Sequence, residues 1–269
     1  MDTTSAIAIA LSGLAWTLAA SVGTWLVSVA QKDASLADRM WPVLIAGSGF
    51  VYWAWAPTLD ARVLALLLLS GLWGLRLCAY ITARNWGHGE DHRYRAMRER
   101  NSPNFGAKSL YLVFGLQAVL AWIVSAPLLS GVLAHPSPLG ILDLAGIALA
   151  AFGIAFEAVG DAQMARFKSD PAHAGQVMDK GLWRCTRHPN YFGETCVWWG
   201  LWLVAWGGAG WAGVWTIVSP VLMTVLLLRV SGVSLLEKDI AERRPAYRDY
   251  MQRTNAFIPG PSRRGQKSA

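Results

Sequence analysis

Long stretches without charge constrain this chain more than any other feature of its sequence. Residues 113–133 contain no charged side chain, and residues 139–156 contain only Asp143. Runs of about 20 apolar residues can cross a bilayer, and backbone groups in lipid must be satisfied within the segment, as in a helix. The pattern predicts an all-α, polytopic membrane protein. A charged fraction of 15%, against about 25% in soluble domains, agrees with this.

The spacing of the apolar runs predicts seven membrane-spanning helices in a single bundle over residues 1–269. The first run lacks the cationic start of a signal peptide and is too long for a signal core, so we interpret it as a retained span. The predicted spans cover residues 5–30, 41–57, 62–83, 109–133, 139–166, 191–206 and 212–236.

Basic residues are concentrated on alternate connections between these runs. They are frequent in the loops 84–108 and 166–190 and in the tail 238–269, whereas the short connections at 135–140 and 207–211 contain none. The positive-inside rule then places the N-terminus outside and the two long loops and the tail in the cytoplasm. We interpret the net charge of +7 as this topology signal and expect no nucleic-acid partner.

The segment RCTRHPNYFGE holds the first candidate ligand-binding residues. Pro189 suits the first turn of a helix, and Asn190 and Glu194, four residues apart, then share a face. An exposed helix N-terminus after Arg184 and Arg187 is suited to bind an anion. The alternative, a capped helix with topology-setting arginines and interfacial tryptophans, fits the same residues equally well.

Two carboxylates near the end of the fifth predicted span form a second group. Glu157 and Asp161 are four residues apart, so they lie on one helical face. Ionised carboxylates at membrane depth repel each other and need a cation, a hydroxyl-bearing ligand or a shared proton. We favour a ligand site over the alternative, a structural ion pair with Arg229 or Arg76.

The third predicted span ends in a further set of polar residues. Tyr80 and Arg84 follow one stripe of the helix, and Gly87 and Gly89 flank His88, which would let the backbone approach a ligand closely. Arginine and glycine together indicate phosphate contact, although a polybasic loop on anionic lipid explains the same residues.

Other candidates stand at the ends of the second and last spans. Asp38 precedes the second span and either caps that helix or points into the bundle as a proton donor. Arg229 and Glu237 follow one stripe of the last span, and the tail after it is suited to an amphipathic surface helix. The sequence contains no Walker motif, no dinucleotide-binding glycine motif and no metal-ligand spacing, so we expect no metal.

Four segments together resemble the bacterial branch of the steroid 5-alpha reductase family: KDASLADRMWP, RNWGHGEDHRYRAMRE, TRHPNYFGE and the tail ending in AYRDYMQRTNAFIP. The resemblance covers nearly the whole chain. It implies a seven-helix bundle in the bacterial inner membrane that binds NADPH from the cytoplasm and transfers a hydride to the C=C bond of a lipophilic enone. Isoprenylcysteine carboxyl methyltransferases share a similar RHP-x-Y helix start and tail.

The resemblance and the position of polar residues at helix mouths assign the site. Glu157 stands where an asparagine is usual in the steroid enzymes, and Trp73 stands where a tyrosine polarises the ketone. In the steroid enzymes a Gln-Glu pair acts together with that tyrosine, and Asp38 is the acid of this chain nearest to the position of the pair. Asp38 and Tyr80 are therefore the predicted catalytic residues, and Tyr52 is an alternative source of the hydroxyl. The predicted NADPH-binding residues are Asn190, Glu194, Tyr191, Arg187, His188, Asp161, Glu157, Asn85, His88, Arg84, Arg229 and Glu237.

Three rival functions remain open on the sequence. A methyltransferase that uses S-adenosylmethionine needs no proton-donating tyrosine, which agrees with Trp73, but it makes less use of Glu157 and Asp161. A non-catalytic lipid-binding or scaffold protein would keep the bundle alone. A transporter is the least favoured, because both carboxylates are expected near the cytoplasmic end of their span rather than at its middle.

Overall fold

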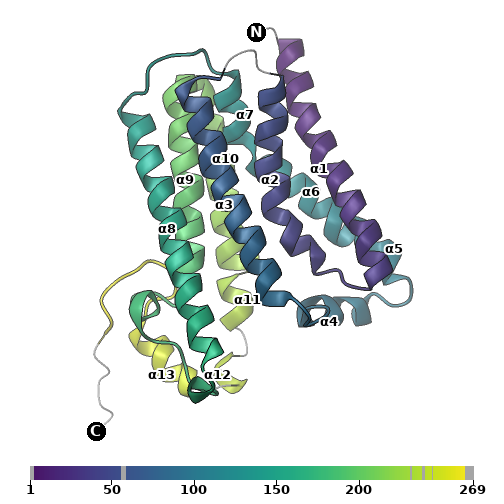
Figure 1. Ribbon diagram of the computed structural model, residues 1–269, viewed down its shortest axis with the longest axis vertical. Coiled ribbons are helices and arrows are strands. Elements are labelled where there is room, and N and C mark those ends of the chain that lie inside the picture. Colours follow the sequence, from purple (N-terminus) through teal and green to yellow (C-terminus); the bar gives the residue numbers. More distant parts are fainter. Residues whose placement is uncertain (1–2, 56–58, 231, 238–239, 244, 264–269) are drawn as a thin grey trace. The chain divides into compact units, whose positions relative to one another are not determined.

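The computed structural model describes residues 3–55, 59–230, 232–237, 240–243 and 245–263 (Figure 1). All regular secondary structure in these ranges is helical, which confirms the all-α prediction for them. The N-terminal elements are α1 (Thr3–Gln31), α2 (Leu36–Ala54), α3 (Ala61–Asn85), α4 (His92–Arg100), α5 (Phe105–Ser109), the π-helix η1 (Leu110–Gly115), α6 (Leu116–Val124) and α7 (Ala126–Leu133). The later elements are α8 (Ile141–Ser169), the 3-10 helices η2 (Pro171–His173) and η3 (Gly181–Arg184), α9 (Pro189–Ala209), the 3-10 helix η4 (Gly210–Ile217), α10 (Val218–Val225), the π-helix η5 (Leu226–Val230), α11 (Val233–Glu237), α12 (Ile240–Arg243) and α13 (Ala246–Arg253).

Five helical stretches in the described part of the chain are long and apolar enough to cross a membrane, and they indicate a membrane protein. They cover Thr4–Gln31, Ala61–Asn85, Phe105–Val124, Ile141–Ser169 and Pro189–Val230. The structure therefore confirms that the described part of the chain contains several apolar helices of membrane-spanning length. The count of seven and the orientation in the membrane stay predictions.

One predicted span and one predicted connection differ from the structure. The span predicted over 109–133 is interrupted at Ser125, because Pro127 stands in the first turn of a new helix, α7. The connection predicted at 207–211 is helical: α9 runs to Ala209 and the 3-10 helix η4 follows from Gly210. Gly207 and Gly208 lie within α9, whereas Gly210 has a φ of +57°, the left-handed conformation that is common just after the end of a helix. The predicted tail 238–269 contains α12 and α13, while residues 238–239, 244 and 264–269 lie outside the described part.

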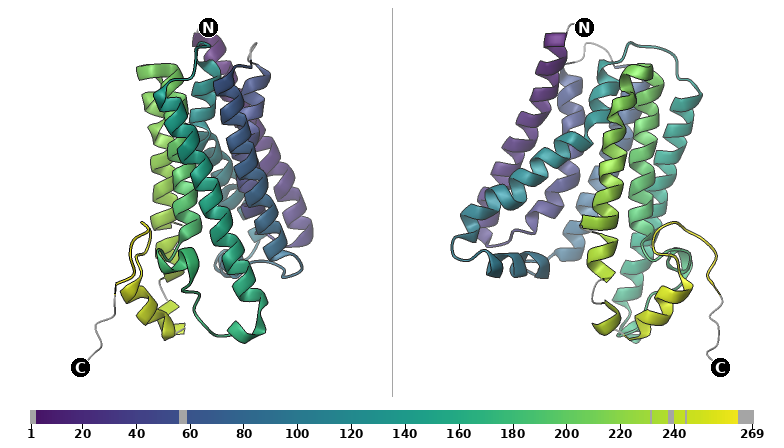
Figure 2. Two further views of the ribbon diagram at one scale, coloured as in Figure 1. Left: turned by 60° about the vertical axis from the view of Figure 1, so that its left-hand side comes forward. Right: turned by 180° about the vertical axis from the view of Figure 1, so that it is seen from behind.

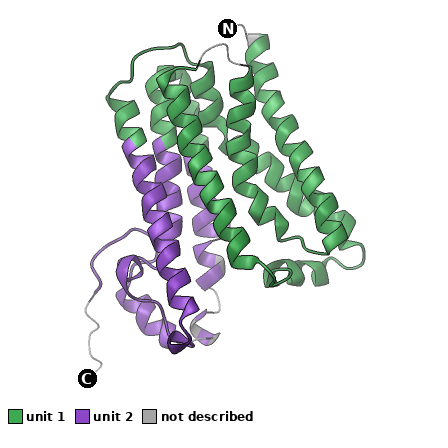
Figure 3. Cartoon of the chain, in the orientation of Figure 1, with its two compact units in different colours: residues 1–147, 201–219 green, residues 148–200, 220–269 purple. Residues whose placement is uncertain are grey.

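Contacts divide the chain into two compact units (Figure 3). Unit 1 comprises residues 1–147 and 201–219, and unit 2 comprises residues 148–200 and 220–269. The boundary falls inside α8, α9 and α10, so each of these helices contributes to both units. The single membrane domain predicted over residues 1–269 stays a prediction.

Unit 1 is built on three neighbouring helices, α1, α2 and α3, with α6 crossing α1 and α2 obliquely (Figure 2). The Trp16 indole donates to the Leu44 carbonyl at 3.1 Å, which joins α1 to α2. A buried bidentate ion pair between Arg62 and Asp143, both 1% exposed, fastens the start of α3 to the start of α8. A methyl group on Gly208 would lie 2.4 Å from the Arg62 side chain, so the end of α9 closes over this pair.

Unit 2 contains the rest of α8 and α9, most of α10 and the helices that follow. Its C-terminal part folds back: the Tyr250 hydroxyl on α13 donates to the Trp183 carbonyl at 2.5 Å, and the Trp183 indole donates to the Gly160 carbonyl on α8 at 2.9 Å. Phe257 packs edge-on against Phe192 of α9, with ring centroids 5.9 Å apart. The tail therefore docks against the ends of α8 and α9 within this unit.

Candidate functional site

Helices α8 and α9 approach each other at two glycines. A methyl group on Gly193 would lie 2.7 Å from the Gly153 carbonyl oxygen and 2.8 Å from both the nitrogen and Cβ of Glu157. A methyl group on Gly153 would lie 2.5 Å from the Gly193 carbonyl oxygen. Backbones this close are possible only because neither position carries a side chain. The glycine pair therefore sets the separation of α8 and α9 beside Glu157.

Three buried carboxylates lie on this pair of helices. Glu157 is 1% exposed, Asp161 3% and Glu194 6%. Asn190 is the second residue of α9 and lies beside Gly160, whose added methyl group would lie 3.6 Å from the Asn190 backbone nitrogen. In the part of the chain that the structure describes, no group of three or more His, Cys, Asp or Glu residues is arranged to hold a metal ion. The polar residues of this helix pair are suited to accept hydrogen bonds from hydroxyl or amide donors.

Arg187 forms the centre of a second cluster, just before α9. Its Nε and one terminal nitrogen donate to the two oxygens of Glu237 at 2.7 and 2.8 Å, and the other terminal nitrogen donates to the carbonyls of Met251 and Thr254. His188 Nε2 also contacts Glu237, at 2.9 Å. The guanidinium is therefore occupied by intramolecular partners. Arg187 joins α9 to the C-terminal segment, and its predicted contact with a phosphate stays a prediction.

The electrostatics of this cluster favour the charged forms of both partners. Burial would raise the pKa of Glu237, but hydrogen bonds from His188 and Arg187 outweigh it and lower the pKa to about 2. Burial would lower the pKa of Arg187, but its hydrogen bonds to the Glu237 carboxylate raise it. The side chains of Arg187 and Glu237 are 9% and 12% exposed, so the pair is shielded from solvent screening.

The N-terminus of α9 is covered, contrary to the exposed helix start expected from the sequence. The Arg187 amide donates to the Asn255 carbonyl at 2.9 Å, and the Thr186 hydroxyl donates to the Phe257 carbonyl at 2.8 Å. The Gly260 amide donates to the Cys185 carbonyl at 3.0 Å. The residues from Thr186 to Pro189 are all buried. The segment 255–260 therefore covers the residues that come just before α9.

The other predicted residues of unit 2 lie near this helix start or on η5. The Tyr191 ring stacks on the His188 ring, with centroids 5.3 Å apart. Arg229 is exposed on the π-helix η5. The contacts predicted for Tyr191 and Arg229 with a nucleotide stay predictions.

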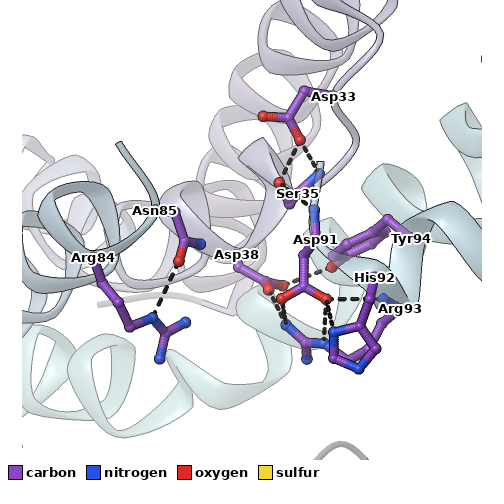
Figure 4. Close-up of polar contacts among 9 residues, drawn as sticks. All are labelled: Asp33, Ser35, Asp38, Arg84, Asn85, Asp91, His92, Arg93 and Tyr94. Carbon is purple, nitrogen blue, oxygen red and sulfur yellow. Dashed lines mark hydrogen bonds and ion pairs between the residues drawn. The ribbon is translucent and has the colours of Figure 1, made fainter. Parts of the chain in front are cut away.

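Asp38 lies in a charged cluster of unit 1, on the first turn of α2 (Figure 4). Its Oδ2 accepts from the Arg93 guanidinium at 2.7 Å, and its Oδ1 accepts from the Tyr94 hydroxyl at 2.6 Å. Arg93 also contacts Asp91, which caps α4 by accepting from the Arg93 amide at 2.9 Å. The N-cap of α2 is Ser35, not Asp38. Asp38 thus fastens α4 to α2, and its predicted catalytic role stays a prediction.

The two carboxylates of this cluster, Asp38 and Asp91, share one cation, Arg93. Burial would lower the pKa of Arg93, but the Asp38 and Asp91 carboxylates raise it. Burial raises the pKa of Tyr94, and the negative charge of Asp38 raises it further. The Tyr94 hydroxyl therefore keeps its proton and serves Asp38 as a hydrogen-bond donor.

The end of α3 carries the remaining predicted residues. The Arg84 guanidinium lies 5.8 Å from the centre of the Tyr80 ring and its Nε donates to the Asn85 side chain at 3.1 Å. His88 is exposed, and its Nδ1 contacts the Trp86 carbonyl at 2.9 Å. Gly87 and Gly89 have φ values of +75° and +68°, which explains why glycines flank the histidine.

Sequence reasoning missed the residues that act through tertiary contacts. Arg93 and Tyr94, which join α4 to Asp38, were not among the predicted site residues. Gly153 and Gly193 were not singled out, although a glycine four residues before Glu157 and another just before Glu194 mark positions of close helix approach.

The predicted site residues fall into two sets. Five belong to unit 1, namely Asp38, Tyr80, Arg84, Asn85 and His88, and nine belong to unit 2, namely Glu157, Asp161, Arg187, His188, Asn190, Tyr191, Glu194, Arg229 and Glu237. Within unit 2 the structure brings Glu157 next to α9 and joins Arg187, His188 and Glu237. A single pocket lined by both sets stays a prediction.

The apolar helices and the buried carboxylates define an all-helical membrane protein with polar residues inside its helix packing. The chain belongs to the family described as "Protein of unknown function (DUF1295)", whose model matches residues 24–254. It is also similar to an uncharacterised protein of the fission yeast Schizosaccharomyces pombe, C594.04c, with 26% identity over 266 residues. That similarity covers 87% of this chain and 75% of the yeast protein. No solved structure matches the chain.

Proposed function

We propose that the chain is an NADPH-dependent oxidoreductase of the bacterial inner membrane that reduces the C=C bond of a lipophilic enone. The observation that carries the proposal is the burial of Glu157, Asp161 and Glu194 on two helices in backbone contact. Buried ionisable residues in apolar helices are costly and usually functional. The resemblance of the surrounding motifs to steroid 5-alpha reductases supports NADPH as the ligand that these residues bind.

The residues of the helix pair fit the nicotinamide half of such a cofactor. Glu157 and Asp161 are acceptors for the hydroxyls of a ribose, and the Asn190 amide both donates and accepts, as a carboxamide requires. The apolar helices around them exclude water from the same region. When bound, the cofactor supplies the hydride, while Glu194 and Asn190 hold and orient its carboxamide.

Arg187 is one of several cations that the sequence predicts near the phosphates of the cofactor. Arg187 is occupied by Glu237 and by two backbone carbonyls, so it supports the start of α9 rather than a ligand. The phosphate contact that the sequence predicts for Arg84, at the end of α3, stays a prediction. We therefore assign Arg187, His188 and Glu237 to positioning the helix that carries Asn190 and Glu194.

A methyltransferase that uses S-adenosylmethionine is the second candidate. Trp73, which stands at the position of the tyrosine expected in a steroid reductase, is fully buried on α3 and carries no hydroxyl to protonate a reduced product. That observation favours a reaction without a proton donor at this place. The two candidates differ in their cofactor, so a binding measurement separates them.

Thermal unfolding of the detergent-purified chain tests the proposal. We expect NADPH to raise the unfolding midpoint of the wild type, and S-adenosylmethionine to leave it unchanged. The Glu194→Gln variant should lose most of the NADPH effect, because a buried carboxylate acceptor becomes a neutral amide. Glu242→Gln makes the same chemical change at an exposed position on α12 and should respond like the wild type.

Protection by S-adenosylmethionine and none by NADPH would establish the methyltransferase instead. Equal NADPH protection of the Glu194→Gln and Glu242→Gln variants would show that α9 does not carry the cofactor site. The absence of protection by either compound would leave a lipid-binding or scaffold protein.

A further inference from the structure

A basic cavity lies in unit 2, outside the apolar helical stretches and away from the buried carboxylates. Its volume is about 360 Å³, which is within the usual range of small-molecule sites. Lys180 and Arg184 line it from the loop before α9, and Arg253 lines it from the end of α13. The rest of the lining is Asp179, Gly181, Thr254 and Ser262. Among the described residues that line the cavity, three cations against one carboxylate leave an excess of two positive charges.

The walls of this cavity are held in place by hydrogen bonds that do not involve its cationic groups. The Leu182 amide donates to the Gln163 side chain on α8 at 3.0 Å, which fixes the wall that carries Lys180 and Arg184. On the other wall, the Ser262 hydroxyl and the Arg263 amide donate to the Arg253 carbonyl at 3.2 and 2.9 Å. A site whose backbone is already ordered loses little entropy when a ligand binds.

Arg253 has donors to spare in this arrangement. One terminal nitrogen donates to Asp179 at 2.7 Å across a pair whose side chains are 41% and 32% exposed. A pair this exposed contributes little stability, so an incoming anion can share the guanidinium with Asp179 at small cost. The Nε of Arg253 is buried and has no hydrogen-bond partner among the described residues. Arg253 is therefore held in this cavity by one exposed ion pair, which an incoming anion can share.

We infer that this cavity binds a phosphomonoester group. An arginine fork and a lysine are the usual partners of phosphate, and a phosphomonoester carries close to two negative charges at neutral pH, which matches the excess charge of the lining. The volume exceeds that of a phosphate alone and leaves space for the alcohol that carries it. The group belongs either to a soluble nucleotide, such as the 2′-phosphate of NADPH, or to the headgroup of phosphatidic acid. The inference goes beyond the proposed function and does not depend on it.

Thermal unfolding of the full chain in detergent micelles tests the inference with two pairs of probes. NADPH is compared with NADH, which lacks the phosphomonoester, and micelles with phosphatidic acid are compared with micelles that contain the same amount of phosphatidylcholine. Each probe is applied to the wild type, to the double variant Lys180→Ala/Arg184→Ala, and to Arg166→Ala/Arg248→Ala. The last variant removes the same charge from exposed positions of unit 2 that do not line the cavity.

We expect NADPH to raise the unfolding midpoint more than NADH does, or phosphatidic acid to raise it more than phosphatidylcholine does. The preference should appear both in the wild type and in Arg166→Ala/Arg248→Ala. Loss of the two cations should weaken the binding of the phosphomonoester probe about tenfold to a hundredfold. The inference is wrong if the wild type is protected no better by NADPH than by NADH and no better by phosphatidic acid than by phosphatidylcholine. It is also wrong if both of these preferences survive in Lys180→Ala/Arg184→Ala. Either result holds whether or not nucleotides bind elsewhere. Protection by phosphatidic acid through Lys180 and Arg184, with no protection by either nucleotide, would support the cavity and refute the proposed function.

Discussion

A single methyl group at Gly193 should separate α8 from α9. In the Gly193→Ala variant the new carbon would lie 2.7 Å from the Gly153 oxygen and 2.8 Å from two atoms of Glu157. Ordinary contact begins at 3.4 Å, so the helices must move apart by about 0.7 Å at this point. The contacted atoms are backbone or Cβ atoms of a helix, which cannot move aside as the end of a flexible side chain can.

The expected cost follows from two opposing effects. Overpacking costs about 1–3 kcal/mol, and the rigid neighbours of Gly193 place it near the upper end of that range. Alanine in a helix is more stable than glycine by about 1 kcal/mol, which offsets part of the loss. We therefore expect Gly193→Ala to lower the free energy of unfolding by about 2 kcal/mol. This corresponds to a fall of about 4–8 °C in the unfolding midpoint of a chain of this size.

Gly23 supplies the matched control for this measurement. It lies inside α1, and a methyl group there would meet nothing within 4 Å. Gly23→Ala should leave the midpoint unchanged or raise it slightly, because only the helix propensity changes. Both variants are compared by thermal unfolding in the same detergent. If Gly193→Ala is as stable as Gly23→Ala, the close approach of α8 and α9 is not what positions Glu157, and the account of the helix pair is wrong.

Three further predictions concern the charged clusters. Arg62→Ala should destabilise the chain by about 3–5 kcal/mol, since Asp143 is left buried and unpaired, whereas Arg62→Met with Asp143→Leu should recover most of the loss in the same unfolding assay. The pKa of Glu237 is lowered in the folded state, so the stability that its carboxylate contributes is complete above pH 4.5 and is lost as the pH falls towards about 2. Glu237→Gln should be less stable than the wild type at neutral pH, and its free energy of unfolding should change less between pH 4.5 and 2. Tyr94→Phe should lower the free energy of unfolding by about 1.5–3 kcal/mol, because it removes the hydrogen-bond donor to Asp38. Hydrogen exchange should then show that α4 opens more often than in the wild type, and unchanged exchange of the α4 amides would contradict this prediction.

Local pattern in the sequence predicted the helices and several of their ends. Pro189 begins α9, as its missing amide suggests, and Glu157 and Asp161 lie on a buried face of α8 because they are one helical turn apart. These features depend on neighbours within a few residues. The same reasoning ended the helix too early, because Gly207 and Gly208 still belong to α9; Gly210, with a left-handed φ of +57°, follows its last residue.

Distant partners could not be predicted from the sequence. Arg187 pairs with Glu237, fifty residues away, and the start of α9 is covered by residues 255–260. A basic segment before a helix is equally compatible with a bound anion and with an acidic partner elsewhere in the chain. The sequence offers no means of choosing between them, because the choice depends on how the C-terminal segment folds back.

The central claim is that Glu157, Asp161 and Glu194 mark the place where the nicotinamide end of NADPH binds. The most direct test is photo-crosslinking of the purified chain with an NADPH analogue that is reactive at its nicotinamide ring, followed by mass spectrometry of the labelled peptides. The account predicts label on α8 between residues 153 and 161 or on α9 between residues 190 and 198, removed by excess NADPH and not by S-adenosylmethionine. Label that NADPH removes only from other parts of the chain, or the absence of any such label, would contradict it.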